Sequence, residues 1–377
     1  MAQLKSIQVL RAIAATAVFL CHLFAIEAGQ ADRDTQLAPV WVAGAYGVDL
    51  FFVISGFVIV WVAADRPVGR TSASQFLYAR VSRIYPTWWL FLGLMMLALM
   101  IFRGAPWDPL RLDQIGLDGP THLFRSIFLL PQPDHPTLGV GWTLVHEMYF
   151  YIGFAALVWV LPQRDRMYGL LAWGALVIAG AVLGLSSAFG RNAIELIFYP
   201  MTLQFIAGGF VAYAIKAGVR RFAYGCAIGG ACGLVAMFFS HGSDWVAALG
   251  QVLPQPWPRT LMFGIPSALL IYGLVALELQ GKAKACFPKA LVELGNWSYA
   301  FYLCHVLTIS VAGRLTYRLL GSDNAWVNAL FCFNAAIATL LCAALTYRFF
   351  EAPMIRYLKD KRPRFGSARA SVSSNLN

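Results

Sequence analysis

Apolar stretches that are long enough to cross a membrane recur along the chain. A helix needs roughly 20 apolar residues to span the hydrocarbon core of a bilayer. Backbone polar groups at that depth must bond within the protein, so each stretch is predicted to be a helix. A window of about 19 residues identifies ten of them. They cover residues 7–26, 44–64, 84–102, 142–161, 167–189, 193–215, 223–240, 260–279, 294–313 and 326–350.

The composition agrees with this pattern. Hydrophobic residues make up 59% of the chain and charged residues 12%, whereas a soluble domain carries about a quarter charged residues. All connections between the stretches are short except 103–141. The sequence therefore predicts an all-α polytopic membrane protein with one integral domain over residues 1–353. The basic, Ser-rich segment 354–377 is predicted to be a disordered tail.

The distribution of Lys and Arg predicts the orientation. Most of the 29 basic residues fall on the side of the membrane that holds the N-terminus. By the positive-inside rule, both termini are then cytoplasmic. The net charge of +11 is explained by this topology. Membrane lipids are therefore expected partners and nucleic acid is not.

Several ionisable residues lie inside the predicted spans, where they are costly and usually functional. His22, Asp49 and Glu147 come from three different spans, and helical rise places each about 6–7 Å below the outer edge. Arg11 precedes His22 by almost three turns on the same face of the first span. His305 lies near the middle of the ninth span. We expect the three groups of equal depth to form one buried polar site.

Arg80 and Arg83 share a helical face where the third span begins. Such residues either anchor a helix to anionic lipid headgroups or bind phosphate, for which the guanidinium group is well shaped. The seven cysteines include none in a predicted outer loop, so no disulfide is expected. No Cys and His pair has the spacing of a zinc site, and no metal is expected.

Six short motifs occur in a fixed order along nearly the whole chain. They are Arg11 with His22, the segment 51–57 with its Ser-Gly-Phe ending, Arg80 with Arg83, Trp142 with Glu147, the segment 298–305, and Glu351 with Pro353. This ordered set resembles the acyltransferase 3 family of integral membrane acyltransferases. The opening segment 6–15 is most similar to members that acetylate bacterial exopolysaccharides. Thr143 stands where members often carry Ser, and it keeps the hydroxyl group.

The resemblance implies an O-acyltransferase of the bacterial cytoplasmic (inner) membrane. Its co-substrate would be cytoplasmic acetyl-CoA or another acyl-CoA, and its acceptor a sugar hydroxyl on an exported or lipid-linked polysaccharide. No hydrolase-like domain follows the last span, so a single-domain member is expected. A macrolide or small-lipid acceptor is an alternative. From a different class, a secondary transporter or glycan exporter would also use intramembrane His, Asp and Glu.

The residue types suggest a division of roles. We hypothesise that His22 is the general base that takes the proton of the acceptor hydroxyl, because an unperturbed pKa of about 6.5 leaves it neutral at working pH. Asp49 or Glu147 would orient the imidazole, and the other carboxylate would hold the sugar. His305 either polarises the thioester carbonyl or bonds between helices.

The arginines are assigned to the donor. Arg11, Arg80 and Arg83 lie near the cytoplasmic face, where they would neutralise the phosphates of acyl-CoA. A covalent acyl-enzyme is the alternative mechanism, with Ser55, Ser298 or Cys304 as the nucleophile. No Gly-x-Ser-x-Gly elbow supports it.

Overall fold

The computed structural model describes residues 3–30, 37–185, 192–240, 243, 256–283, 287–321 and 324–361. These residues form helices and contain no strand. The long helices are α1 (Lys5–Gln30), α2 (Gly47–Ala63), α3 (Arg70–Arg103), α6 (Trp142–Val160), α7 (Arg166–Val182), α9 (Thr202–Lys216), α10 (Ala223–Phe239), α12 (Trp257–Leu279), α13 (Lys289–Leu320) and α14 (Ala325–Thr346). The short elements are η1 (Pro39–Tyr46), α4 (Pro109–Ile115), α5 (Gly119–Phe128), η2 (Gly139–Gly141), η3 (Gln163–Asp165), α8 (Ala193–Ile197), η4 (Tyr347–Glu351) and α15 (Ala352–Asp360).

Each of the ten predicted spans coincides with a helix or a broken helix. Within the described residues, eight helical segments are long and apolar enough to cross a membrane. The other two are α10, which has 17 residues, and α13, which has 32 residues and polar side chains along its middle. A polytopic all-α membrane protein is therefore confirmed. The count of ten and the orientation of the termini stay predictions.

Several helix boundaries differ from the prediction. Helix α3 begins at Arg70 rather than at residue 84, because its polar first turns extend the helix beyond the apolar stretch. The predicted span 193–215 is broken around Pro200 into α8 and α9, as expected for a residue that disrupts a helix. Helix α15 runs to Asp360, into the segment predicted to be a disordered tail. Residues 362–377 lie outside the described residues.

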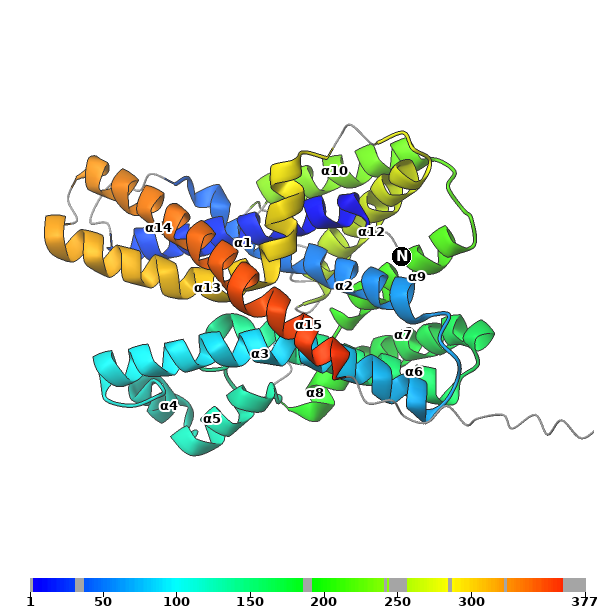
Figure 1. Ribbon diagram of the computed structural model, residues 1–377, viewed down its shortest axis with the longest axis horizontal. Helices are drawn as coiled ribbons and strands as arrows, with labels where there is room; N and C mark the ends of the chain where they lie inside the picture. The colour runs from blue at the N-terminus through cyan, green and yellow to red at the C-terminus, as the bar shows by residue number, and fades with distance from the viewer. Residues whose placement is uncertain are drawn as a thin grey trace, which may run out of the picture.

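The helices pack closely through small residues. Figure 1 shows α1, α13 and α14 together in one part of the bundle and α3 with α6 in another, and α15 crosses over α3. Helices α2 and α9 touch backbone to backbone: a Cβ atom on Gly56 would lie 1.8 Å from the Phe205 carbonyl oxygen, and one on Gly208 would lie 1.9 Å from that of Val53. Such contacts are typical of membrane helices. They fix α2, which forms one wall of the site described below.

The start of α1 is held by a carboxylate from α12. Glu278 accepts hydrogen bonds from the backbone amides of Lys5 (2.8 Å) and Ser6 (2.9 Å) and from the Ser6 hydroxyl (2.5 Å). The first amides of a helix have no partner within it, and a negative charge there is favourable. This cap fixes the position of α1 along its axis, and with it the depth of Arg11 and His22.

Arg166 ties together the ends of three helices. It is the first residue of α7, it is fully buried, and it donates to the carbonyl oxygens of Ala64 (2.7 Å), at the end of α2, and Leu161 (3.2 Å), just after α6. Replacing Arg166 with Ala should lower the free energy of unfolding by about 1–3 kcal/mol, because buried carbonyl groups lose their partners. Denaturant unfolding in detergent micelles measures the change.

Arg164 provides the matched control. Its side chain is 87% exposed and its only ion pair in the described structure, with Asp165, is 3.6 Å long. Exposed pairs of this kind contribute little to stability, so Arg164→Ala should leave unfolding unchanged. Equal effects of the two substitutions would show that Arg166 does not cap the helix ends.

Candidate active site

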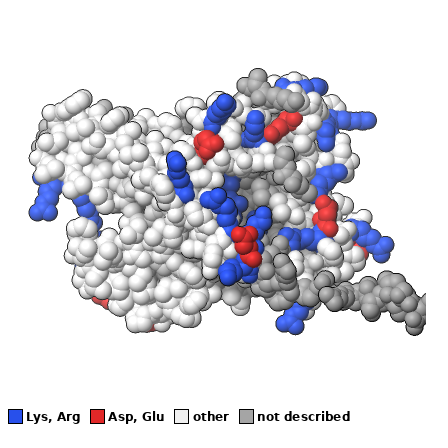
Figure 2. All heavy atoms as spheres, viewed as in Figure 1, with Lys and Arg blue, Asp and Glu red and all other residues white. Residues whose placement is uncertain are grey.

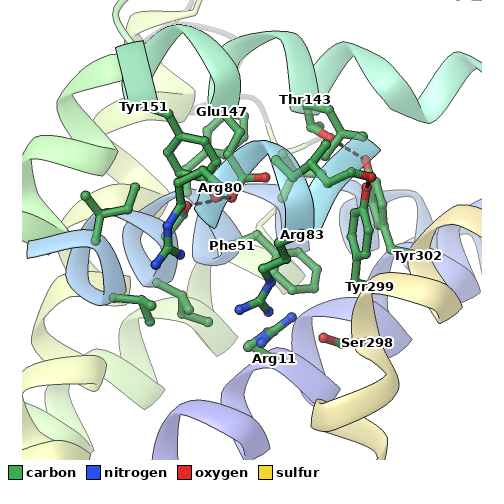
Figure 3. Close-up of a pocket in the computed structure, with 18 residues that line it drawn as sticks. Arg11, Phe51, Arg80, Arg83, Thr143, Glu147, Tyr151, Ser298, Tyr299 and Tyr302 are labelled. Carbon is green, nitrogen blue, oxygen red and sulfur yellow. Dashed lines mark hydrogen bonds between the residues drawn. The ribbon is translucent and has the colours of Figure 1, made fainter. Parts of the chain in front are cut away.

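A cavity of about 810 Å³, including the space where it opens outward, lies between α1, α2, α3, α6 and α13. Its wall on α2 is largely apolar. Its other walls carry arginine, glutamate, tyrosine and serine side chains, as Figure 3 shows. The polar lining residues are Arg11, Ser55, Arg80, Arg83, Thr143, Glu147, Tyr151, Ser298, Tyr299 and Tyr302.

Three arginines face this cavity without a carboxylate partner. Arg11 comes from α1, and Arg80 and Arg83 come from α3, one turn apart. None of the three forms an ion pair within 4.0 Å among the described residues. Figure 3 shows the guanidinium groups of Arg11 and Arg83 facing the same space. Unpaired charges in a largely apolar setting are costly, so the cavity is suited to an anionic ligand.

Arg80 lies against aromatic rings. Its guanidinium carbon is 5.6 Å from the centre of the Phe76 ring and 5.8 Å from that of Tyr151. Its buried Nε atom has no hydrogen-bond partner in the described structure. The two rings hold the cation by cation–π attraction and leave hydrogen-bonding capacity free for a ligand.

Glu147 is the carboxylate that lines the cavity. Its Oε1 atom accepts hydrogen bonds from the hydroxyl groups of Ser55 (2.8 Å) and Tyr151 (2.5 Å). Tyr151 lies one turn further along α6, and Ser55 comes from α2. The two hydroxyl donors hold the carboxylate of Glu147 in place beside the three arginines.

Asp49 has other partners. It is fully buried on α2, where it accepts from Arg259 (Nη2, 2.8 Å; Nε, 2.9 Å) and from the Gln204 amide (2.7 Å). The Arg259 guanidinium also lies 5.2 Å from the centre of the Tyr46 ring and 5.9 Å from that of Trp142. This buried pair joins α2, α9 and α12. Sequence reasoning missed Arg259, although an arginine at the outer end of the eighth predicted span matches the depth of Asp49.

His22 pairs with His305. The Nδ1 atom of His22 lies 2.9 Å from the Val18 carbonyl oxygen and 3.3 Å from Nε2 of His305. The Nδ1 atom of His305 lies 2.6 Å from the Tyr302 carbonyl oxygen. A carbonyl oxygen only accepts, so in neutral rings both Nδ1 atoms carry the hydrogen. His305 is buried and its two nitrogens are both engaged, whereas Nε2 of half-buried His22 keeps its lone pair for a proton.

The expected meeting of His22 with Asp49 and Glu147 is wrong. In the described structure His22 bonds to Val18 and His305, Asp49 bonds to Arg259 and Gln204, and Glu147 bonds to two hydroxyl groups. The rise of a helix gives the depth of a residue in the membrane, but not the direction in which its side chain points. Equal depth therefore did not produce contact.

Tyr302 connects the cavity to the histidine pair. It lines the cavity, and its hydroxyl lies 2.9 Å from the Thr143 hydroxyl and donates to the Val140 carbonyl oxygen (3.0 Å). The centres of the Tyr302 and His305 rings are 5.7 Å apart. The histidine pair thus lies directly behind one wall of the cavity. The structure brings Arg11, Arg80, Arg83 and Glu147 into the cavity lining and places His22, Asp49 and His305 outside it.

Comparison with known proteins identifies the family. The acyltransferase 3 family model, described as an acyltransferase domain, matches residues 4–348. The chain belongs to the acyltransferase 3 family. As a member of this family it is a membrane O-acyltransferase with several spans, and it uses an acyl donor. Among the described residues no group of three or more His, Cys, Asp or Glu side chains could hold a metal ion.

Several curated proteins are similar to this acyltransferase. It is 32% identical to the exopolysaccharide production protein ExoZ of Rhizobium meliloti, over 86% of this chain and 94% of that protein. It is 29% identical to the acyltransferase MdmB of Streptomyces mycarofaciens, over 96% and 94% of the two chains. The O-acetyltransferase OatA of Staphylococcus aureus is 22% identical, over 85% of this chain and 54% of OatA. No solved structure matches the chain.

Proposed function

We propose that the protein transfers an acetyl or other short acyl group from cytoplasmic acyl-CoA to a sugar hydroxyl of an exported or lipid-linked polysaccharide. The observation that carries the proposal is the set of three arginines, without carboxylate partners in the described structure, that faces one cavity. The name of ExoZ supports an exopolysaccharide acceptor, and the name of OatA supports transfer of acetyl to oxygen.

The donor would enter from the cytoplasmic face of a bacterial inner membrane. Figure 2 shows Lys and Arg side chains gathered over one part of the molecule, around a hollow. By the positive-inside rule this part faces the cytoplasm, together with both termini. Arg11, Arg80 and Arg83 would bind the phosphates of the donor, for which guanidinium groups are well suited. Lipid anchoring is the less favoured role, because the arginines line an internal cavity.

The thin arm of the donor would extend from the arginines toward the histidine pair. Arg11 and His22 are about 16 Å apart along α1 at the rise of a helix. The apolar wall of α2 suits an uncharged arm, and Tyr302 stands where the cavity approaches His305. The thioester would then lie within reach of His22.

In the proposed reaction His22 is the general base. Its Nε2 atom takes the proton of the acceptor hydroxyl while the hydroxyl oxygen attacks the thioester carbon. The carbon–sulfur bond breaks, and the thiolate of CoA leaves and takes the proton from the imidazolium. His305 is a positioning residue: it accepts from Nδ1 of His22 and so keeps Nε2 free. Glu147 would hold the sugar of the acceptor, and Asp49 would keep α2 in place through Arg259.

Membranes that contain the protein test this proposal directly. Acetyl-CoA labelled in the acetyl group is mixed with these membranes and the surface glycan of the host, and released CoA and labelled glycan are both measured. We expect the two products in equal amounts, and neither without the glycan. Glycan movement across the membrane without CoA release would contradict the proposal and favour an exporter.

The Ser55 hydroxyl gives the covalent mechanism one supporting observation. It donates to Glu147 at 2.8 Å beside the cavity, so Glu147 would serve as its base. In that mechanism labelled acetyl accumulates on the protein when the acceptor is left out, and Ser55→Ala abolishes transfer. In direct transfer no label stays on the protein, and Ser55→Ala keeps most of the activity.

A further inference from the structure

The last long helix carries a buried carboxylate that the reaction proposed above does not use. Between α14 and α15 the chain makes one π-helical turn, Tyr347–Glu351, and Pro353 follows in the first turn of α15. Proline has no amide hydrogen to donate to the preceding turn. A turn of this kind is rare and is frequently found at functional sites. Here it ends at Glu351, just beyond the residues that match the family model.

Glu351 lies near two arginines of the cavity but is not one of the residues that line it. It is 3% exposed, and its Oε2 atom is buried without a hydrogen-bond partner in the described structure. It is close enough to Arg11 and Arg83 to attract both electrostatically, yet neither lies within 4.0 Å as an ion pair. The turn that carries it contacts both α3 and α13. Glu351 therefore acts on the arginines without filling the space in front of them.

The two arginines need such a group because they repel each other. Arg83 is the positive charge that acts most strongly on Arg11, and the two guanidinium groups face the same space from different helices. In surroundings of low dielectric constant like charges repel strongly. Glu147 also attracts Arg11, but it lines the cavity itself. A negative group near both offsets the repulsion and lets them face one anion together.

We propose that Glu351 is a positioning residue that holds Arg11 and Arg83 in the orientation that binds the phosphates of the acyl donor. This inference rests on the proposed function, which assigns the donor to these arginines. Glu351 does not touch the reacting atoms. It acts on binding of the donor and leaves the chemical step unchanged.

The test is a split between KM and kcat in Glu351→Gln. The KM for acetyl-CoA should rise about five- to tenfold, within the ~10²-fold that a misplaced group costs, while kcat stays the same. Glu351→Asp keeps the charge with a shorter reach and should give a smaller rise. Glu293→Gln is the control, because Glu293 is exposed on α13 and lies outside the cavity lining. Its KM for the donor should equal that of the wild type.

A double variant separates positioning from a general structural role. If Glu351 acts through Arg83, then Glu351→Gln should add little to the KM of Arg83→Gln, whereas independent effects multiply. An unchanged KM in folded Glu351→Gln, a fall in kcat alone, or multiplying effects in the double variant would overturn the inference.

Direct binding of acetyl-CoA to purified protein distinguishes failure of this inference from failure of the proposed function. If the wild type binds and Glu351→Gln binds equally well, the inference fails and the proposed function stands. If the wild type does not bind, both fall. Should Glu351→Gln not accumulate in membranes, the Glu351→Asp variant decides: a raised KM supports the inference, and an unchanged KM contradicts it.

Discussion

Replacing His22 with Ala is expected to lower kcat by about 10²- to 10⁴-fold, the usual contribution of a general base. The reason is that the two nitrogen atoms of its imidazole ring differ in their partners. The Val18 carbonyl and His305 both engage Nδ1, which leaves Nε2 as the basic atom. No imidazole is among the cavity-lining residues of the described structure, and both nitrogens of His305 are engaged. Single-turnover transfer of labelled acetyl measures the loss.

Binding of the donor should survive this change. Arg11 is about 16 Å from His22 along α1, so His22→Ala should bind acetyl-CoA with an unchanged Kd. Cys21→Ala is the neighbouring control; its thiol donates to the Val42 carbonyl oxygen at 3.4 Å, and transfer should continue at the normal rate. Transfer at the wild-type rate by a folded His22→Ala protein would show that another group takes the proton.

Replacing Glu147 with Gln should lower kcat/KM by about 10- to 100-fold, because a hydrogen bond to a charged group contributes about 1.5–3 kcal/mol. Glu147 is the carboxylate that lines the cavity, and two hydroxyl groups already hold it in place. The amide of the new glutamine keeps the shape of the carboxylate and removes its negative charge. Steady-state rates at varied concentrations of acceptor glycan and of donor measure the effect, which we expect mainly on the acceptor.

Tyr151→Phe is the matched control for Glu147. It removes one hydroxyl that bonds to the carboxylate and keeps the negative charge, so a loss of only a few-fold is expected, in line with about 1 kcal/mol for an ordinary hydrogen bond. If Glu147→Gln is as active as the wild type, the carboxylate takes no part in the reaction. If Ser55→Ala is as inactive as Glu147→Gln, the covalent mechanism is favoured instead.

The helices and the group of arginines were accessible from the sequence for simple physical reasons. The length of an apolar stretch matches the thickness of a bilayer, so the positions of the helices followed from hydropathy. Arg80 and Arg83 are three residues apart on one helix, so their shared face followed from helical periodicity alone. The polar start of α3 was missed, because hydropathy does not detect a helix that continues outside the apolar layer.

The partners of the buried charged residues could not be predicted from the sequence. Asp49 and Arg259 are 210 positions apart in the chain, and His22 and His305 are 283 apart. Which helix lies beside which, and how each is rotated, depends on close packing such as that at Gly56 and Phe205. Depth along a span is a local property, whereas contact is a property of the whole bundle. The π-helical turn at Glu351 was also invisible, because it has no signature in hydropathy.

The central claim is that the cavity with Arg11, Arg80 and Arg83 holds the acyl donor, and binding of acetyl-CoA to Arg83→Gln tests it most directly. Titration of purified protein in lipid nanodiscs gives the Kd. We predict a Kd about tenfold weaker than that of the wild type, equivalent to about 1.4 kcal/mol, and an intermediate value for Arg83→Lys, which keeps a charge without the planar fork. Arg111→Gln, which breaks a pair with Asp134 away from the cavity, should bind normally. An unchanged Kd in Arg83→Gln would contradict the account.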